Sequence, residues 1–180
     1  MSVRLVLVRH GLSSVNEKGL IQGRTDDSYL TDKGYEQALK SGEALSGINF
    51  DKIYSSPLLR AAETAKTIQK NLRGENNIVY DNNLLEVDLC KWSGLTINEI
   101  QKKYPENYLL WKNDPENLKL EGNDNLRYQP IQELYDQANE FIKNILKIYL
   151  EKNEANILVI GHNAILRCLI LSLIGRPKKG

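Results

Sequence analysis

Two histidines are the residues of this chain whose positions best suit chemistry. His10 directly follows an apolar segment at residues 3–8, His162 follows another at residues 157–160, and the sequence contains no other histidine. Short β-branched segments are typical of strands in a parallel sheet, where ligands bind at the carboxyl ends of the strands. One such histidine could merely satisfy a hydrogen bond of its loop, but two placed alike predict a shared site.

Two arginines indicate that this site binds an anion. Arg9 adjoins His10, and Arg60 is expected one turn into a helix that follows a second strand. A planar guanidinium group binds phosphate oxygens through paired hydrogen bonds, which a lysine point charge cannot do. A single arginine more often forms an ordinary surface salt bridge. Because both arginines are expected at the sheet edge that carries both histidines, the four residues together indicate phosphate binding.

The segments that position these residues alternate between strands and helices. Apolar runs predict strands at residues 3–8, 48–54, 78–80 and 157–160. Helices are expected from Thr31 to about Leu45, from the Ser55-Ser56-Pro57 segment to about Leu72, from Thr96 to Lys103, from Ile131 to Lys152, and after His162 to Ile174. The alternation predicts an α/β fold with a mostly parallel sheet, in one domain of residues 1–180.

Local signals place the ends and faces of these helices. Thr31 and Thr96 are typical N-caps, and the serine before Pro57 is a capping residue placed directly before a proline that suits a first helical turn. The long helix is amphipathic, with an apolar side that comprises Leu134, Phe141, Ile145, Ile148 and Tyr149.

Two segments lack a sustained period. Residues 11–30 contain Gly11, Gly19 and Gly23 and are expected to form a long functional loop. Residues 104–128 are rich in Pro, Asn and Gly and are expected to form an irregular, lid-like insertion that builds the pocket for the leaving group.

Composition excludes several classes of function. With 24 basic and 23 acidic residues the net charge is +1, so the chain lacks the broad positive field of a nonspecific nucleic-acid binder. Cys90 and Cys168 are far apart, and with two histidines they leave almost no ligands for a metal site. We expect no metal, no cofactor, no signal peptide and no membrane span, and a reducing, cytoplasmic setting. The oligomeric state stays open.

Ordered motifs resemble those of the histidine phosphatases, also called the phosphoglycerate-mutase-like superfamily. Arg9-His10-Gly11 with Ser13 and Asn16 resembles the RHGxSxxN signature, and residues 30–38 resemble LTxxGxxQA. Residues 55–65 are similar to SSPLxRAxxTA without a gap, and Gly161-His162 supplies the fourth motif. The resemblance implies a three-layer α/β/α sandwich with a mostly parallel central sheet, and a small phosphorylated metabolite as the substrate.

The resemblance also implies roles for the residues. His10 would be the nucleophile, which requires an unprotonated attacking nitrogen. Arg9, Arg60 and His162 would surround the transferred phosphoryl group and stabilise its charge. Asn16, Gln22, Gly23 and the backbone N–H of Asn163 are candidate donors to phosphate or substrate.

A carboxylic acid must supply the proton that the leaving alkoxide takes. Glu86 resembles the family's acid, which stands in an LxE segment ahead of a WxG element, here Trp92-Ser93-Gly94. Burial near the phosphate would raise its pKa and so keep it protonated. Asp88 is the alternative acid, and either carboxylate could instead be a surface or capping group.

The residue after His162 and the end of the chain are among the features that depart from the family pattern. Asn163 follows His162 where Gly is usual, and we expect the turn to survive because asparagine tolerates a positive φ. Related domains continue past the last helix into a further strand, whereas this sequence stops at residue 180. We therefore expect a truncated chain, a fragment or a short natural variant, in which a pairing partner could cover an exposed sheet edge.

Three functions fit these residues. A metal-independent phosphatase acting through phosphohistidine on His10 is favoured. A cofactor-dependent phosphoglycerate mutase would need extra basic residues in its insertion, where residues 95–130 carry only scattered cations: Lys102, Lys103, Lys112, Lys119 and Arg127. A phosphate-ligand-binding protein without turnover is the third alternative.

Overall fold

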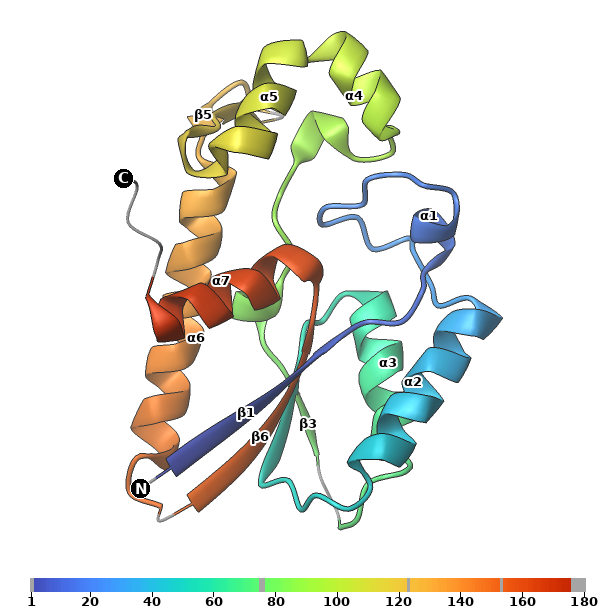
Figure 1. Ribbon diagram of the computed structural model, residues 1–180, viewed down its shortest axis with the longest axis vertical. Coiled ribbons are helices and arrows are strands. Elements are labelled where there is room, and N and C mark those ends of the chain that lie inside the picture. The colour runs from blue at the N-terminus through green and yellow to red at the C-terminus, as the bar shows by residue number, and fades with distance from the viewer. Residues whose placement is uncertain (1, 75–76, 123, 153, 176–180) are drawn as a thin grey trace.

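Four parallel strands form the central sheet of this protein, which we describe from a computed structural model covering residues 2–74, 77–122, 124–152 and 154–175. In the order β1-β6-β2-β3, the strands are Ser2–Arg9, Glu154–Gly161, Lys52–Ser55 and Ile78–Tyr80 (Figure 1). All three strand pairs are parallel. The predicted α/β fold is therefore confirmed, with strand starts that differ from the expected ones by a few residues.

Strand β6 lies inside the sheet, and its side chains alternate between two hydrophobic cores. Ile157 and Val159 belong to one core, whereas Leu158 and Ile160 belong to the other. All four are fully buried, as expected for a parallel strand that is covered on both faces. Strand β1 was expected to be buried in the same way but is only half-buried, because it has a neighbour on one side only within the described sheet.

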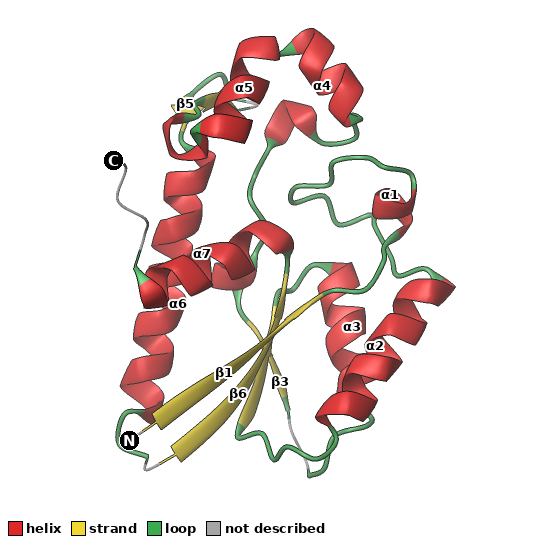
Figure 2. Ribbon diagram, viewed as in Figure 1, coloured by secondary structure: helices red, strands yellow, loops and turns green. Residues whose placement is uncertain are grey.

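Helices cover both faces of the sheet, which confirms the three layers. On one side lie α2 (Asp32–Leu45) and α3 (Leu59–Gln69), and on the other lie α6 (Pro130–Tyr149) and α7 (Asn163–Ile174) (Figures 1 and 2). Helix α3 contributes Ala61, Ala65 and Ile68 to the core beneath it, and α6 contributes Leu134, Phe141 and Ile145 to the opposite one.

The predicted threonine caps are confirmed. Thr31 Oγ1 accepts a hydrogen bond from the Gly34 N–H at 3.1 Å. Thr96 forms a capping box with Glu99 at the start of α4 (Ile97–Lys103). In both cases the side chain satisfies a backbone donor that the first helical turn leaves unpaired.

The expected start of α3 is wrong. The helix begins at Leu59 rather than at Pro57, and Leu58 occupies the N-cap without a side-chain hydrogen bond. The Ser56 hydroxyl contacts the Leu58 N–H at 3.3 Å and the His162 ring at 2.8 Å, so this serine orients a histidine instead of capping the helix. At the other end α3 stops at Gln69, short of Leu72.

Helix α6 agrees with the predicted amphipathic helix except at one apolar position and at its end. Four of the five residues assigned to its apolar side are buried, but Ile148 is 56% exposed. The helix ends at Tyr149 rather than Lys152. Among the described residues, no helix combines the length and apolar character needed to cross a membrane.

The insertion at 104–128 is not irregular as predicted. It contains α5 (Pro105–Asn113) and the antiparallel pair β4 (Leu120–Glu121) and β5 (Arg127–Tyr128). The apolar residues of α5 are consecutive at 108–111, so they show no helical period, although Pro105 in the first turn is a recognisable start signal. Outside the insertion, the long loop at 11–30 contains the short helix α1 (Ser14–Glu17).

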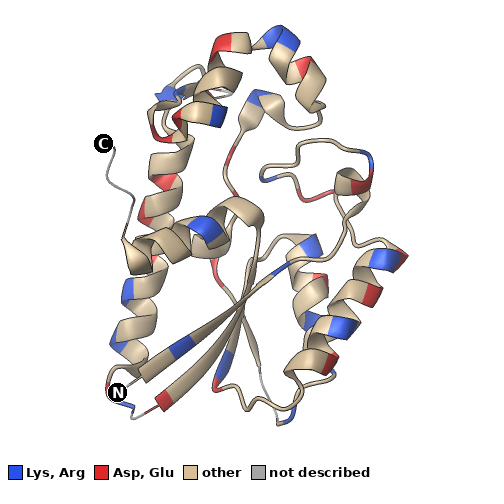
Figure 3. Cartoon of the chain, in the orientation of Figure 1, with Lys and Arg blue, Asp and Glu red and all other residues tan. Residues whose placement is uncertain are grey.

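Short 3₁₀ helices complete the connections, at Asn82–Leu84, Cys90–Trp92 and Pro115–Asn117. Lys and Arg are interspersed with Asp and Glu over the helices (Figure 3), in keeping with the net charge of +1. The expected end of the chain at 176–180 and position 123 lie outside the described residues.

The loop after β1 packs directly on the first turn of α2. A Cβ added at Gly11 would lie 2.4 Å from the Gly34 oxygen, and one added at Gly34 would lie 2.2 Å from the Leu12 oxygen. Both backbone polar groups of Leu12 form hydrogen bonds: its N–H donates to Gln37 Oε1, and its oxygen accepts from the Thr31 N–H. Helix α2 therefore fixes the backbone that follows His10.

We expect Gly34→Ala to lower the free energy of unfolding by about 1–3 kcal/mol, because the added methyl must displace backbone rather than a flexible side chain. Chemical denaturation measures this change. Gly47→Ala is the matched control, since a Cβ there meets nothing within 4 Å. Equal free-energy changes in the two variants would contradict the close backbone contact.

Candidate active site

The two histidines meet because β1 and β6 pair in register. Arg9 pairs with Gly161, and the His10 N–H donates to the Gly161 oxygen at 3.0 Å. The next residues, His10 and His162, therefore leave the sheet side by side, with ring centroids 5.1 Å apart. His10 is 7% exposed and His162 is fully buried. The structure thus brings together the two histidines that the sequence places after separate strands.

His10 is held as a neutral ring with one defined tautomer. Its Nδ1 lies 2.7 Å from the Gly11 oxygen, and a carbonyl oxygen can only accept, so Nδ1 carries the hydrogen and Nε2 keeps its lone pair. Burial lowers the pKa of His10 from 6.5 to about 4, helped by the Arg60 and Arg9 charges and opposed by the Gly11 hydrogen bond. At neutral pH, Nε2 is available as a nucleophile.

His162 is the N-cap residue of α7 and is also held neutral. Burial, and then the nearby Arg60 charge, lowers its pKa well below 6.5. Its Nε2 lies 2.8 Å from the Ser56 hydroxyl, while its Nδ1 is buried without a hydrogen-bond partner among the described residues. Sequence reasoning assigned Ser56 a capping role and missed its contact with His162, although its place at the end of β2, on the same sheet edge, could have suggested one.

Arg60 is almost completely buried beside the histidines. It is 1% exposed and occupies the first turn of α3. Its two terminal nitrogens donate to the Thr25 and Gly23 oxygens, both at 2.8 Å, whereas Nε has no partner among the described residues. Burial lowers the pKa of Arg60, but a guanidinium group stays charged at neutral pH. The site therefore keeps a fixed positive charge and unpaired buried nitrogens, which suit an anion.

Arg9 is the exposed member of the group. It ends β1, and its charge lowers the pKa of both His10 and His162, which places it close to each ring. Thr64 strengthens the same edge, because its hydroxyl accepts from the Gly11 N–H at 3.1 Å and donates to the Arg60 oxygen at 2.7 Å. Thr64 lies in the motif at residues 55–65 and is a positioning residue that sequence reasoning missed.

The candidate donors Asn16, Gln22 and Gly23 lie in the loop that holds Arg60. The Ser13 hydroxyl lies 3.2 Å from Asn16 Oδ1 and 3.0 Å from Gln22 Oε1. Gly23 has a φ of +53°, and it presents its carbonyl oxygen to Arg60. These contacts organise the loop, and a donor role toward substrate stays a prediction for all three residues.

Asn163 takes a conformation different from the one expected. It is the first residue of α7, and it does not belong to the non-glycine residues with positive φ. Asparagine is therefore accommodated here by helix geometry rather than by its tolerance of positive φ. Its side chain is exposed at the edge of the site.

Glu86 reaches the N-terminus of α7, next to His162. Its Oε1 accepts from the N–H groups of Val87 at 2.9 Å, Ala164 at 3.2 Å and Ile165 at 3.3 Å. Burial raises the pKa of Glu86, and these hydrogen bonds and the Arg60 charge oppose that rise. The carboxyl group therefore lies near Arg60 with a raised affinity for a proton, as an acid catalyst requires.

The alternative acid, Asp88, has a different local role. Its Oδ1 accepts from the Cys90 N–H at 2.9 Å, and its backbone oxygen accepts from the Tyr128 hydroxyl at 3.1 Å. These contacts form the turn into the 3₁₀ helix at Cys90–Trp92. The geometry therefore favours Glu86 over Asp88 as the proton donor.

A hollow of about 360 Å³ opens beside Glu86, and we call it the α5–α7 hollow. Its wall includes Trp111 and Lys112 of α5 and Asn163, Ala164 and Arg167 of α7. Ala164 also donates to Glu86, so the hollow and the acid share the start of α7.

Buried histidines and an arginine at the carboxyl edge of a parallel sheet, within three layers, define a phosphoglycerate mutase-like α/β protein. The chain belongs to the histidine phosphatase superfamily, branch 1, whose family model matches residues 5–180. The solved structure of Bacillus stearothermophilus YhfR has a TM-score of 0.86 and 27% sequence identity, and the match covers 98% of this chain and 82% of that one.

Named relatives include phosphatases and a mutase. The probable 2-carboxy-D-arabinitol-1-phosphatase of Arabidopsis thaliana is 37% identical over 172 residues, and phosphoserine phosphatase 1 of Hydrogenobacter thermophilus is 31% identical over 175. Both matches cover 96% of this chain, which spans 33% of the plant protein and 77% of the bacterial one. A 2,3-bisphosphoglycerate-dependent phosphoglycerate mutase of Thermoplasma acidophilum is 30% identical, covering 83% of this chain and 77% of that protein.

The neutral state of His10 makes stability depend on pH. Below its ordinary pKa of 6.5 the unfolded chain binds a proton that the folded ring resists until about pH 4, so the unfolding free energy falls as the pH falls through this window. We expect His10 to account for a loss of about 2 kcal/mol between pH 7 and pH 5. Urea denaturation at both pH values measures the loss.

The variant His10→Gln should lose correspondingly less stability over the same pH interval, because glutamine does not titrate. His162 remains in both proteins and serves as an internal reference. Equal losses in parent and variant would show that His10 is not held neutral by the fold.

Proposed function

We propose that this chain is a phosphatase that hydrolyses a small-molecule phosphate monoester through a phosphohistidine on His10. The observation that carries the proposal is the fixed tautomer of a buried, neutral His10 beside His162 and the charged Arg60. The lone pair on Nε2 supplies the nucleophile, and the surrounding buried nitrogens supply the charge and the donors that a phosphoryl group requires.

The first step forms a nitrogen–phosphorus bond and breaks the ester bond. His10 Nε2 attacks phosphorus, and the leaving oxygen takes the proton of Glu86 as its bond to phosphorus breaks. Arg60, Arg9 and His162 stabilise the charge on the phosphoryl oxygens. The backbone carbonyl of Gly11 holds the Nδ1 hydrogen of His10 and stabilises the positive ring of the intermediate.

The second step returns the enzyme to its starting state. The Glu86 carboxylate takes a proton from water, and the water oxygen attacks phosphorus. The nitrogen–phosphorus bond then breaks and releases inorganic phosphate, leaving His10 neutral and Glu86 protonated. The same carboxyl group thus acts as acid and then as base.

We expect the purified protein to release phosphate from 4-nitrophenyl phosphate with EDTA present, and His10→Ala to abolish this release because it removes the nucleophile. Colorimetric measurement of phosphate gives the rates. Equal release by parent and variant would contradict the proposal.

Two further outcomes separate the alternatives. Interconversion of 3- and 2-phosphoglycerate that depends on 2,3-bisphosphoglycerate would favour a mutase, which the Thermoplasma relative keeps open. Stabilisation by phosphate esters without turnover would favour a ligand-binding protein. Lys112 lines the α5–α7 hollow, but Lys119 and Arg127 line a different pocket, so the insertion's cations are scattered and we favour hydrolysis.

The role of Glu86 makes a separate prediction that depends on the leaving group. An alkyl phosphate needs a proton for its alkoxide, whereas 4-nitrophenolate leaves without one. We therefore expect Glu86→Gln to lower kcat/KM about 10²- to 10⁴-fold for an alkyl phosphate and far less for 4-nitrophenyl phosphate. Asp88→Asn is the matched control, and selective loss in that variant instead would make Asp88 the acid.

We also propose that the leaving group lies in the α5–α7 hollow. The hollow adjoins Glu86 through Ala164, as the site of proton transfer requires. Arg167 and Lys112 line it, are exposed, and have no ion pair among the described residues, so they suit a leaving group that carries a carboxylate. Phosphate esters of hydroxy acids and amino acids are therefore the first compounds to screen, with His10→Ala as the control.

A further inference from the structure

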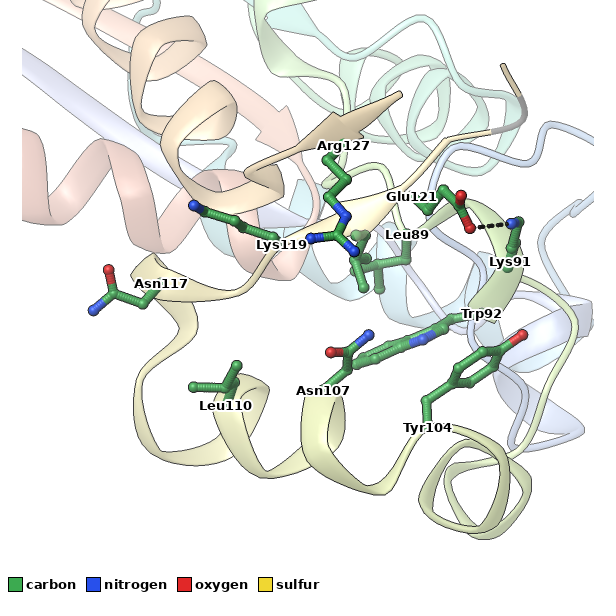
Figure 4. A pocket seen from close by; sticks show the side chains of 11 residues that line it. Leu89, Lys91, Trp92, Tyr104, Asn107, Leu110, Asn117, Lys119, Glu121 and Arg127 are labelled. Carbon is green, nitrogen blue, oxygen red and sulfur yellow. Dashed lines mark hydrogen bonds and ion pairs between the residues drawn. The ribbon is translucent and has the colours of Figure 1, made fainter. Parts of the chain in front are cut away.

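We propose that the insertion carries a second, non-catalytic site that binds a small anion with a planar ring. We call it the hairpin pocket, because the β4–β5 hairpin forms one of its walls (Figure 4). It has a volume of about 510 Å³, within the range of small-molecule sites. Its remaining walls come from α5 and the 3₁₀ helix at Cys90–Trp92.

The register of the hairpin places three charged residues on one of its faces. Leu120 pairs with Tyr128 and Glu121 with Arg127, so Lys119, Glu121 and Arg127 share the face opposite to Leu120. Leu120 is buried and anchors the hairpin in the core. The orientation of the charged face is therefore fixed: in Figure 4 Arg127 points toward Asn107 and Glu121 toward Lys91, whereas Lys119 extends to the side away from Trp92.

Two of the cations at the pocket have no ion-pair partner among the described residues. Glu121 forms an ion pair with Lys91, with 2.8 Å between Oε2 and Nζ, so these two charges compensate each other. In the described part of the chain, the side chains of Lys119 and Arg127 form no hydrogen bond or ion pair, and both residues also line a neighbouring hollow along α6. The pocket is thus lined by two cations outside ion pairs, and Arg127, a guanidinium suited to paired bonds with phosphate or carboxylate, also lies within electrostatic reach of Glu121.

Aromatic and amide groups complete the pocket. The rings of Trp92 and Tyr104 are stacked at 30°, with centroids 6.4 Å apart, and lie together along one side (Figure 4). Asn107 projects between them and Arg127, where its amide can bind polar atoms of a ring or sugar. An anion with a planar ring, as in a nucleoside monophosphate, matches both the cations and the aromatic side.

The hairpin pocket is distinct from the candidate active site. None of the residues proposed for phosphoryl transfer lines it. The hairpin and α5 lie near the end of α6 that is remote from the strand starts, beyond the carboxyl edge of the sheet (Figure 1). A ligand here would therefore bind without occupying the place of the transferred phosphoryl group.

The test measures binding of adenosine monophosphate by isothermal titration calorimetry in the His10→Ala background, where turnover is absent. We expect Lys119→Ala with Arg127→Ala to raise the dissociation constant at least about tenfold, because two charge-assisted contacts are lost. Lys40→Ala with Lys147→Ala is the matched control, since it removes two exposed cations elsewhere and should leave the constant unchanged. Thermal unfolding of each variant verifies that it is folded.

Two further measurements test where the ligand binds and which class of ligand the pocket prefers. Trp92 and Trp111 are the two tryptophans of the chain, and we expect the ligand-induced change in fluorescence to persist in Trp111→Phe and to vanish in Trp92→Phe. Adenosine and inorganic phosphate should each bind at least about tenfold more weakly than the monophosphate.

Three results would overturn the proposal. The first is an unchanged dissociation constant in the variant that lacks Lys119 and Arg127, which would leave binding only at the catalytic site. The second is an equal loss in the matched control, which would indicate a general effect of charge. The third is binding of inorganic phosphate as tight as that of the monophosphate, which would remove the aromatic part of the site. The catalytic proposal is independent of all three results.

Discussion

Parallel pairing at the carboxyl edge of the sheet is the constraint on which the rest of the site depends. The His10 N–H donates to the Gly161 oxygen, and the Ser56 N–H donates to the Ile160 oxygen. The hydrogen-bond ladder with β6 therefore continues one residue beyond the ends of β1 and β2. The neighbouring strands β1, β6 and β2 are therefore followed by His10, His162 and Ser56 at the same place on the sheet edge. A register shift of one residue would turn each ring to the other face of the sheet.

Burial then gives these residues their chemical properties. Taking both imidazoles out of water beside the Arg60 charge disfavours their protonated forms, while the same burial disfavours the charged form of Glu86. A single physical cause thus lowers the pKa of both histidines and raises the pKa of Glu86 around a fixed cation. The cation is held by the oxygens of Gly23 and Thr25, so its position depends on the loop rather than on the sheet.

The insertion at 104–128 lies outside this arrangement of buried residues. Its elements stand on α6 and on the segment that follows Glu86, and they line two separate hollows. One hollow adjoins Glu86 through α7, and the other lies under the hairpin and is lined by Lys119 and Arg127. The proposed phosphoryl site is built from strand ends and helix starts, whereas the proposed ligand contacts come from short elements and loops, which tolerate change more easily.

Local signals in the sequence determined the strands, the threonine-capped helices and the alternation that specifies the α/β fold, because apolar periodicity and capping are properties of neighbouring residues. Motif order also indicated which histidines and arginines belong together. Only the tertiary structure decided that Ser56 orients His162, that Thr64 joins Gly11 to Arg60, and that Glu86 rather than Asp88 reaches α7, because these contacts join residues far apart in the chain. The ordered insertion was missed for a related reason. Helix α5 and the hairpin are specified by packing against Trp92 and α6, and no periodic pattern within the segment records that packing.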